Sequence, residues 1–330
     1  MHREAFGIDA AGAPVERATL RAEGMTARVM TWGAVLQELR LDGIGHALTL
    51  GFPRFEDYPA HSPDFGSVVG PVANRIRGGA ATVGGVERRF DLNCLGRHTL
   101  HGGRAGTGKL NWRMEAATAD EARLALDLAD GHMGFPGPIS IRVAYRIEPG
   151  PSLVFEAEAR AEIETVVNLA HHSYFALDGP GSDARDQILS VEAARYLPVD
   201  EDLCPTGEVR PVESGPFDFR APRPVGRAGY DHNFCLSDGR VALRPVAALR
   251  GPASGVAMTI ETTEPGLQVY DGSSIPSDGP PGLDGARFGA HAGLALEPQR
   301  WPDAPNQAWS AQAALAPGAL YRQTSVLRFS

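Results

Sequence analysis

The stretch that decides the fold is ISIRVAYRI, residues 139–147. Its odd positions, from Ile139 to Ile147, are all apolar, whereas Ser140, Arg142 and Arg146 on even positions are polar. Alternation with a period of two is typical of a β-strand that buries one face and exposes the other. Short apolar runs of this kind recur between turn signals along the chain. Further strands are predicted at residues 27–32, 123–128, 152–159, 256–261 and 293–297.

Composition supports an all-β protein. The 330 residues include 39 glycines and 26 prolines, about a fifth of the chain, so long helices are not expected. The best helix candidate, AATADEA at 116–122, is short. Residues 178–186 and the Gly- and Pro-rich segment from Asp271 to His291 read as surface loops. We therefore predict one large antiparallel β-sandwich that forms a single domain over residues 1–330.

Charge and hydropathy exclude several classes of protein. With 31 basic and 40 acidic residues the net charge is −9, which argues against a nucleic-acid partner. No apolar run approaches the length of a membrane span, and the first residues lack an apolar signal core. Cys94, Cys204 and Cys235 are odd in number and form no C-x-x-C pair, as expected of reduced thiols. We expect a cytoplasmic protein with no membrane partner.

Two adjacent histidines stand in NLAHHSYFAL, residues 168–177. If this stretch is a strand, His172 and Tyr174 share one face while His171 lies on the other. The two imidazoles therefore diverge, and one metal ion would not easily bind both. A satisfied structural histidine is one interpretation. The other is a proton donor, because imidazole titrates near neutral pH.

A carboxylate of interest follows in LALEP, residues 294–298. Leu294 and Leu296 are expected to face the core and Glu297 the opposite side, with Pro298 ending the strand. Two interpretations of Glu297 are open. It is an exposed or ion-paired carboxylate, or, if it lies in a cleft opposite a histidine, it is a general base. In the second case, loss of solvation would move its pKa toward working pH.

Other polar residues allow more than one interpretation. Arg75 in GPVANRI suits loop carbonyls, sugar hydroxyls or a developing oxyanion. His98 and His101 fall on opposite faces of an extended chain, and Asp231 to Asn233 diverge in a strand, so metal sites at either place are poor hypotheses. No single one of these signals is specific.

Seven short motifs, taken in their order along the chain, resemble those of the aldose 1-epimerase (galactose mutarotase) family. The ordered markers are ANRI (73–76), LHGG (100–103), HSYF (172–175), PTGE (205–208), DHNF (231–234), PGLQVY (265–270) and LEPQ (296–299). The resemblance covers nearly the whole chain. It implies a β-sandwich of the supersandwich type, an isomerase of carbohydrate metabolism, with an open cleft for a monosaccharide and no metal or organic cofactor.

The resemblance also implies roles for individual residues. His172 matches the general acid and Glu297 the general base of ring opening and closure. Residues that match those holding the sugar hydroxyls are Asn74, Arg75, His101, Asp231 and Gln268, and Tyr174 lies beside the acid. From charge alone, Asp231 is expected near His172 or a sugar hydroxyl, where it would keep the imidazole charged.

Some positions depart from the common family pattern: Pro71 replaces an Arg, His171 an Asn, and Asp271 and Ser273 a Thr and an Asn. They leave open which aldose is the substrate, galactose or glucose being examples. Three alternatives remain: a hexose-6-phosphate 1-epimerase served by Arg77, Arg97, Arg104 and Lys109, a non-catalytic sugar-binding protein, and a glycosidase using Glu297 and Asp231. We expect a monomer or a weak homodimer.

Overall fold

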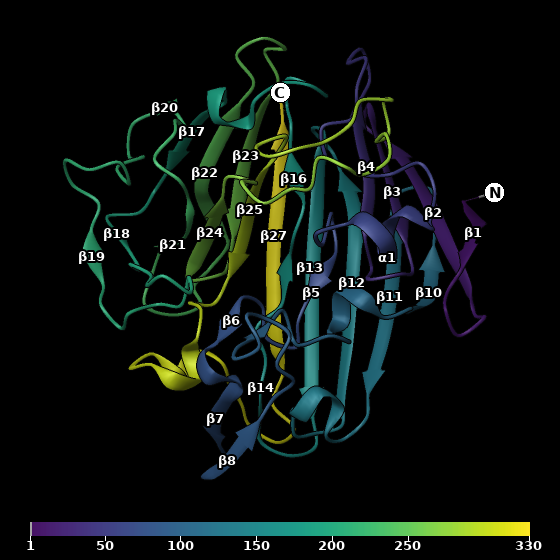
Figure 1. Cartoon of the computed structure of the whole chain (residues 1–330). Helices are drawn as coiled ribbons and strands as arrows, with labels where there is room; N and C mark the ends of the chain where they lie inside the picture. Colours follow the sequence, from purple (N-terminus) through teal and green to yellow (C-terminus); the bar gives the residue numbers. More distant parts are fainter. Residues whose placement is uncertain (1) are drawn as a thin grey trace.

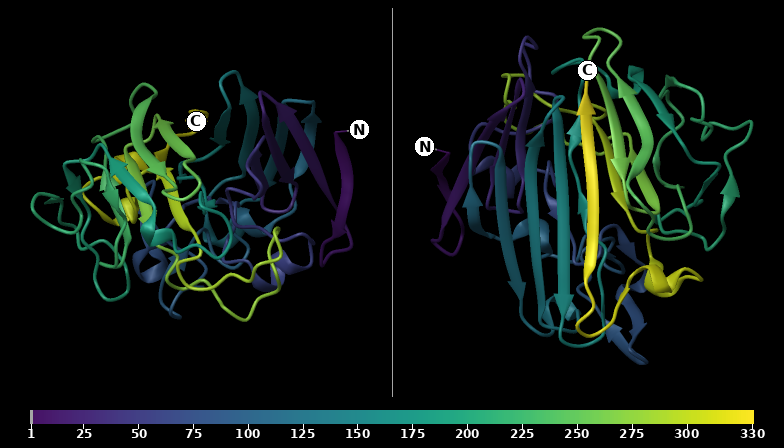
Figure 2. Two further views of the ribbon diagram at one scale, coloured as in Figure 1. Left: turned by 90° about the horizontal axis from the view of Figure 1, so that it is seen from above. Right: turned by 180° about the vertical axis from the view of Figure 1, so that it is seen from behind.

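A nine-stranded antiparallel sheet forms the back of the molecule in the computed structural model, which describes residues 2–330 (Figure 1). Its longest strands lie side by side when the molecule is seen from behind (Figure 2). In spatial order the strands are β10 (Arg113–Ala117), β11 (Glu121–Leu128), β12 (Ile139–Glu148), β13 (Ser152–Ala161), β27 (Tyr321–Phe329), β23 (Ala257–Thr262), β22 (Arg244–Arg250), β17 (Ile188–Val191) and β20 (Arg223–Pro224).

Two smaller antiparallel sheets supply the other layer. One contains β1 (Arg3–Ile8), β2 (Pro14–Ala22), β3 (Met25–Met30) and β4 (Leu36–Leu41). The other has the order β16 (Tyr174–Phe175), β25 (Leu294–Gln299), β24 (Gly266–Tyr270), β21 (Asp231–Cys235), β18 (Arg195–Tyr196) and β19 (Arg210–Pro211). Strand β2 contacts β10, β11 and β12, so the first sheet packs on that end of the large sheet.

Short ladders and turns complete the chain. Four two-stranded ladders pair β5 (Val68–Val69) with β15 (Ala170–His171), β6 (Arg75–Ile76) with β9 (Thr99–Leu100), β7 (Ala80–Val83) with β8 (Val86–Arg89), and β14 (Thr165–Val166) with β26 (Ala314–Leu315). The helical segments are α1 (Asp57–His61) and the 3-10 turns η1 (Arg77–Gly79), η2 (Thr107–Lys109), η3 (His132–Gly134), η4 (Ala184–Asp186), η5 (Ala304–Asn306) and η6 (Ser310–Gln312). Among residues 2–330, no helix has the length and apolar character needed to cross a bilayer.

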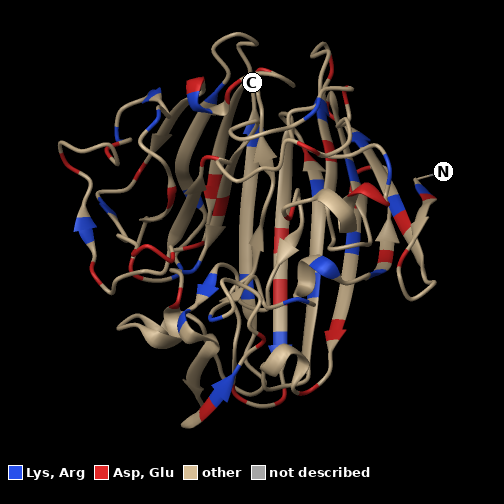
Figure 3. Ribbon diagram, viewed as in Figure 1, with Lys and Arg blue, Asp and Glu red and all other residues tan. Residues whose placement is uncertain are grey.

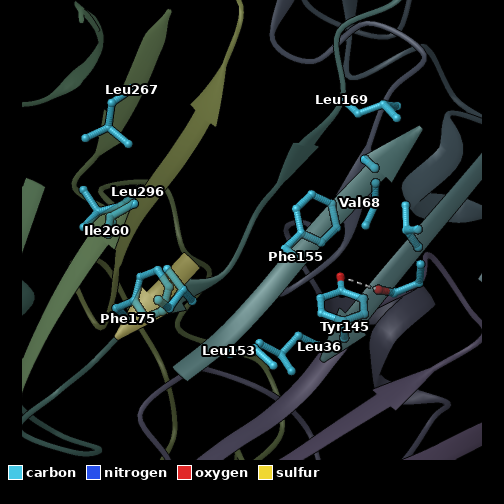
Figure 4. Packing of buried hydrophobic residues seen from close by; sticks show 14 of the residues in the cluster. Leu36, Val68, Tyr145, Leu153, Phe155, Leu169, Phe175, Ile260, Leu267 and Leu296 are labelled. Carbon is cyan, nitrogen blue, oxygen red and sulfur yellow. Dashed lines mark hydrogen bonds between the residues drawn. The ribbon is translucent and has the colours of Figure 1, made fainter. Parts of the chain in front are cut away.

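The core lies between the layers, as the alternation in residues 139–147 predicts. In β12 the odd positions are buried, and Tyr145 is fully so, with its hydroxyl donating to the Ala34 carbonyl at 2.8 Å. Figure 4 shows Tyr145 beside Phe155, Leu153 and Leu36. On the other side Ile260 packs with Leu267 and Leu296, which belong to the same cluster. The prediction of an all-β antiparallel sandwich is confirmed.

Three local predictions are wrong. Residues 116–122 form no helix, because Ala117 of β10 pairs with Ala122 of β11 across a hairpin. Residues 168–177 form two short strands, β15 and β16, rather than one. Pro298 does not end its strand, since β25 continues to Gln299. Strand β16 pairs only with Leu294 and Ala295 of β25, so Pro298 lies beyond the paired part of that edge.

The predicted loops are irregular, as expected. Residues 271–291 form no strand or helix, yet they are tied to the body of the protein. Asp284 pairs with Arg40 at 2.6 Å, and the ring of Phe288 lies 5.8 Å from that of Phe52. The predicted 178–186 loop contains only the 3-10 turn η4.

Candidate functional site

Strand register gathers three polar residues on the outer face of the six-stranded sheet. Glu297 of β25 pairs with Gln268 of β24, and Asp231 of β21 pairs with Tyr270, which also belongs to β24. Leu294 and Leu296, at the alternate positions of β25, face the core as predicted, and so does Leu267 of β24. Since directly opposed residues point to the same side of a sheet, Glu297, Gln268 and Asp231 face away from the core together.

His172 follows β15 and completes the centre of the site. The imidazole Nε2 lies 3.4 Å from Glu297 Oε1. Both side chains are buried, and both Glu297 Oε2 and His172 Nδ1 have no hydrogen-bond partner among the described residues. His171 turns the other way, stacks on Phe155 and bonds Ser173, as the period of two predicts. Burial, and then the nearby His172, lowers the pKa of His171 to about 3, so this imidazole is neutral.

A cavity of about 450 Å³ opens above these two side chains. We call it the main cavity. Its lining comprises Pro63, Asp64, Asn74, Arg75, Leu100, His101, His172, Tyr174, Leu203, Gly229, Tyr230, Asp231, His232, Tyr270, Ser273, Ser274 and Glu297. Seven of the eight residues singled out from the sequence are therefore in its wall. The eighth, Gln268, lies behind Asp231 and donates to its carboxylate at 2.6 Å.

Asn74, Arg75 and His101 reach the main cavity from the β6–β9 ladder. Asn74 and His101 both have left-handed backbone, with φ of 62° and 51°. The Asn74 amide donates to His101 Nδ1 at 3.2 Å, and the His101 amide donates to the Asn74 carbonyl at 3.0 Å. Because Nδ1 accepts, the ring proton is assigned to Nε2. Burial, and then His172, holds the pKa of His101 well below its usual value, so His101 is a neutral donor.

Asp231 lines the main cavity without a hydrogen bond to His172, which is one of the two placements expected from charge. Its carboxylate accepts from Gln268 and lies 3.5 Å from the Arg75 guanidinium, and it makes no hydrogen bond to His172 within residues 2–330. Asp231 therefore anchors Arg75 and Gln268 at the rim of the main cavity. Arg75 Nε and Gln268 Oε1 are buried without a partner in the described chain.

The environment of Glu297 changes its acidity. Burial raises the pKa of this carboxyl to about 7; the nearby His172 opposes the shift, while Asp231 and Asp64 add to it. The sequence-based expectation that desolvation moves this pKa toward neutral is confirmed by the direction of the shift. A carboxylate and an imidazole in contact can move two protons in opposite directions.

Sequence reasoning missed part of the lining, notably Asp64, Leu203 and Tyr270. Asp64 stands in SPDFG, whose only signal is that of a turn, and Leu203 is an ordinary apolar residue. As for metals, residues 2–330 hold no group of three or more His, Cys, Asp or Glu side chains arranged to bind an ion. His98 instead contacts Asp202 at 3.1 Å, away from His101.

The sequence of this chain is similar to those of a known protein family. Residues 16–328 match the model of the family described as Aldose 1-epimerase. The chain belongs to the aldose 1-epimerase family. It is 38% identical to the galactose mutarotase of Mus musculus, with 99% of this chain and 98% of the relative covered.

Two solved structures share the fold of this family member. An aldose epimerase homologue from C. elegans superposes with a TM-score of 0.87 at 27% identity, over 95% of this chain and 99% of the other. A galactose 1-epimerase from Lactobacillus acidophilus gives 0.86 at 27% identity, over 99% and 98% of the chains. Like other members of the aldose 1-epimerase family, this protein is an isomerase.

Proposed function

We propose that this aldose 1-epimerase interconverts the α and β anomers of a free aldose, such as galactose or glucose, with Glu297 as general base and His172 as general acid. The observation that carries the proposal is the 3.4 Å contact between His172 Nε2 and Glu297 Oε1 at the floor of the main cavity. The name of the mouse relative, galactose mutarotase, supports the choice of substrate class.

The reaction requires such a pair of neighbours. Ring opening removes the proton of the C1 hydroxyl, forms the C1 carbonyl, breaks the bond from C1 to the ring oxygen and protonates that oxygen. Both oxygens are bonded to C1, so the base and the acid must lie side by side. Glu297 takes the hydroxyl proton and His172 gives its proton to the ring oxygen. Rotation about C1–C2 exposes the other carbonyl face, and closure returns both protons.

The electrostatics suit this exchange. The pKa of Glu297, raised to about 7 by burial, makes its carboxylate a stronger base than an exposed one and still leaves it ionised in part at neutral pH. The competent form has an ionised Glu297 beside a protonated His172. Once the sugar has opened, the carboxyl is neutral and so is the imidazole. The net charge of the pair is zero in both states, which avoids an isolated buried charge.

The remaining polar groups bind and orient the sugar. His101 offers its Nε2–H, and Arg75 offers a guanidinium fixed by Asp231. Asn74 and Tyr174 add hydrogen-bonding groups beside them, while Gln268 acts through Asp231. Fixed donors and acceptors hold C1 and the ring oxygen against the acid and base, which removes the entropic cost of finding that geometry.

Charge in the main cavity favours a free sugar over a sugar phosphate. Of the four basic residues considered for phosphate binding, three are in ion pairs: Arg77 with Asp200 at 2.7 Å, Arg104 with Asp91 at 2.5 Å, and Arg97 with Asp202. The cavity wall itself contains Asp64, Asp231 and Glu297 against one arginine. A phosphate dianion there would meet more negative than positive charge.

The other two alternatives receive less support from the site. A glycosidase using Glu297 and Asp231 needs the second carboxyl free to act, but both oxygens of Asp231 are engaged by Gln268 and Arg75. A binding protein does not need a buried acid and base in contact without further partners, since such groups are costly to the fold.

The test is a screen of the wild-type protein by polarimetry and NMR exchange. Freshly dissolved α-galactose, α-glucose and the matching 6-phosphates are followed with and without enzyme. We expect the free sugars to equilibrate faster than the spontaneous rate by several orders of magnitude, with the 6-phosphates at least tenfold poorer in kcat/KM. Acceleration of the phosphates alone would replace this proposal with the phosphate epimerase, and binding without acceleration would leave a sugar-binding protein.

We also propose that the protein works in the cytoplasm, as its three unpaired cysteines are consistent with a reducing compartment. Two of them, Cys204 and Cys235, are buried, and burial raises the pKa of each thiol, to about 11 and about 12. Fractionation of the source cells with an antibody to the protein tests this location.

A further inference from the structure

Asp64 is a carboxylate in the main cavity that the reaction scheme above does not use. It lies between α1 and β5 and shares the cavity wall with His172, Tyr174 and Glu297. It also borders a second, adjoining cavity of about 250 Å³, whose lining includes Trp32 and Lys109. Its charge is among the influences that raise the pKa of Glu297.

The backbone around Asp64 is fixed to the segment between β15 and β16 that carries His172. Gly66 donates to the His172 carbonyl at 3.0 Å, and His172 donates to the Ser67 carbonyl at 2.9 Å. The Tyr174 hydroxyl donates to the Pro63 carbonyl at 3.2 Å. A displacement of Asp64 relative to the proton-transfer pair would break these bonds, so its position is set by the same contacts that set His172.

The side chain of Asp64 has no structural task in this turn. Its backbone is left-handed, with φ of 65°, and an aspartate in such a turn commonly accepts from a nearby backbone amide. Here those amides are engaged elsewhere: Phe65 donates to Ser62 Oγ at 2.7 Å and Ser67 to the Asp64 carbonyl at 3.1 Å. Within residues 2–330 the Asp64 carboxylate makes no hydrogen bond and no ion pair, whereas that of Asp231 makes both.

We propose that Asp64 is a substrate-recognition residue, whose carboxylate accepts a hydrogen bond from a sugar hydroxyl on the Tyr174 side of the main cavity. Asp231 and Arg75, which form an ion pair, line the same cavity. The inference rests on the proposed function and adds a consequence to it. A fixed negative charge at this place favours neutral aldoses and disfavours sugars that carry a carboxylate, such as hexuronic acids.

The test compares galactose and galacturonic acid as substrates of the wild type and Asp64→Asn. Asparagine keeps the size of the side chain and tolerates left-handed backbone, so the variant is expected to fold. The amide oxygen is a weaker, uncharged acceptor, so the variant should raise KM for galactose about tenfold with kcat nearly unchanged. The ratio of kcat/KM for galacturonic acid to that for galactose should rise, also by about tenfold.

Asp278→Asn is the matched control, because Asp278 is exposed in the 271–291 loop and its loss changes the net charge by the same amount. It should leave KM and the ratio as in the wild type. Unchanged values in Asp64→Asn would overturn the inference while the proposed function stands. A fall in affinity accompanied by a fall of more than about 5 °C in Tm would also overturn it, since the role would then be structural.

Calorimetric titration with galactose separates this inference from the proposed function. If the wild type binds galactose and accelerates no anomer exchange, the epimerase proposal fails, yet Asp64→Asn still reports on recognition. Weaker binding in this variant alone supports the role of Asp64. Equal binding in the wild type, Asp64→Asn and Asp278→Asn rejects it.

Discussion

At the scale of single residues, burial alters the acidity of two carboxyl groups, with different consequences. Glu297 and Glu264 are both buried, and in each case burial raises the pKa to about 7. Glu297 faces the main cavity and contacts His172, whereas Glu264 lies in the protein interior, with Thr263 as its side-chain partner and Oε2 unpaired among the described residues. The same physical effect therefore suits the proposed catalysis at one position and costs stability at the other.

The pH dependence of activity follows from Glu297. Because its carboxylate is the proposed base and its pKa is raised to about 7, we expect kcat/KM to rise with pH, by close to tenfold per unit below pH 7, and to stop rising above it, since the competent pair also keeps one proton. The apparent value belongs to the Glu297–His172 pair as a whole. Polarimetry between pH 5 and 8, corrected for the spontaneous rate, measures this profile. A flat profile from pH 5 to 7 would contradict the assignment.

The pH dependence of stability tests Glu264. Its folded pKa is raised above the unfolded value, so its contribution to stability is full below pH 4.5 and is lost as pH rises through about 7. We expect Glu264→Gln to stabilise the protein by about 2 kcal/mol at pH 8 relative to pH 5. The readout is the difference in Tm between the two pH values. The exposed Glu192→Gln serves as control, and an identical pH dependence in wild type and Glu264→Gln would refute the idea.

At the scale of elements, the site depends on how loops from distant parts of the chain approach one another. Gly102 in the LHGG motif has φ of 82°, and a Cβ there would lie 1.9 Å from the Gly70 carbonyl oxygen. This close approach joins the segment that precedes Asn74 to the one that follows His101. A glycine at this position therefore sets the spacing between two residues proposed to bind the sugar.

Gly102→Ala should lose both stability and activity. Gly12 is a matched control, since it has the same φ of 82° and an added Cβ there would meet no atom within 4 Å. We expect Gly12→Ala to cost about 1 kcal/mol from backbone strain alone, and Gly102→Ala to cost several kcal/mol and to reduce kcat/KM. Denaturant unfolding measures the loss of stability in the two variants, and polarimetry measures the loss of kcat/KM. Equal losses would show that the contact with Gly70 is unimportant.

Strands and turns of this protein differ in how well the sequence predicts them. Period-two alternation identifies β12, since Tyr145 and its neighbours bury one face throughout. It also separates His171 from His172. It fails for residues 116–122, where helix-forming alanines pair across the β10–β11 hairpin and Ala122 enters the core, so tertiary packing overrides local propensity. Asp64 was missed because a carboxylate in a turn has no sequence signal of where it points.

At the scale of the whole molecule, charge is spread without a dominant basic face. Figure 3 shows acidic and basic residues interleaved over both layers, in keeping with the net charge of −9. The prediction of a monosaccharide partner is consistent with this surface and with the cavity above the six-stranded sheet. That the chain is one domain remains a prediction, although the family match spans residues 16–328.

The oligomeric state is expected to be a monomer or a weak homodimer. The most exposed large apolar side chains, Ile8 and Leu95, belong to different parts of the chain, which does not favour a large apolar interface. Light scattering after gel filtration should give about 35.1 kDa at micromolar concentration, rising only at high concentration. A concentration-independent mass of a dimer or larger assembly would contradict this prediction.

The central claim is that Glu297 and His172 exchange protons with the two oxygens bonded to C1 of the sugar, Glu297 with the hydroxyl and His172 with the ring oxygen. Polarimetric kcat of Glu297→Gln and His172→Asn tests it most directly, with galactose titration and Tm confirming that each variant folds and binds. We predict that either change lowers kcat by about 10²–10⁴-fold while galactose still binds. Near wild-type kcat in either folded variant would contradict the claim.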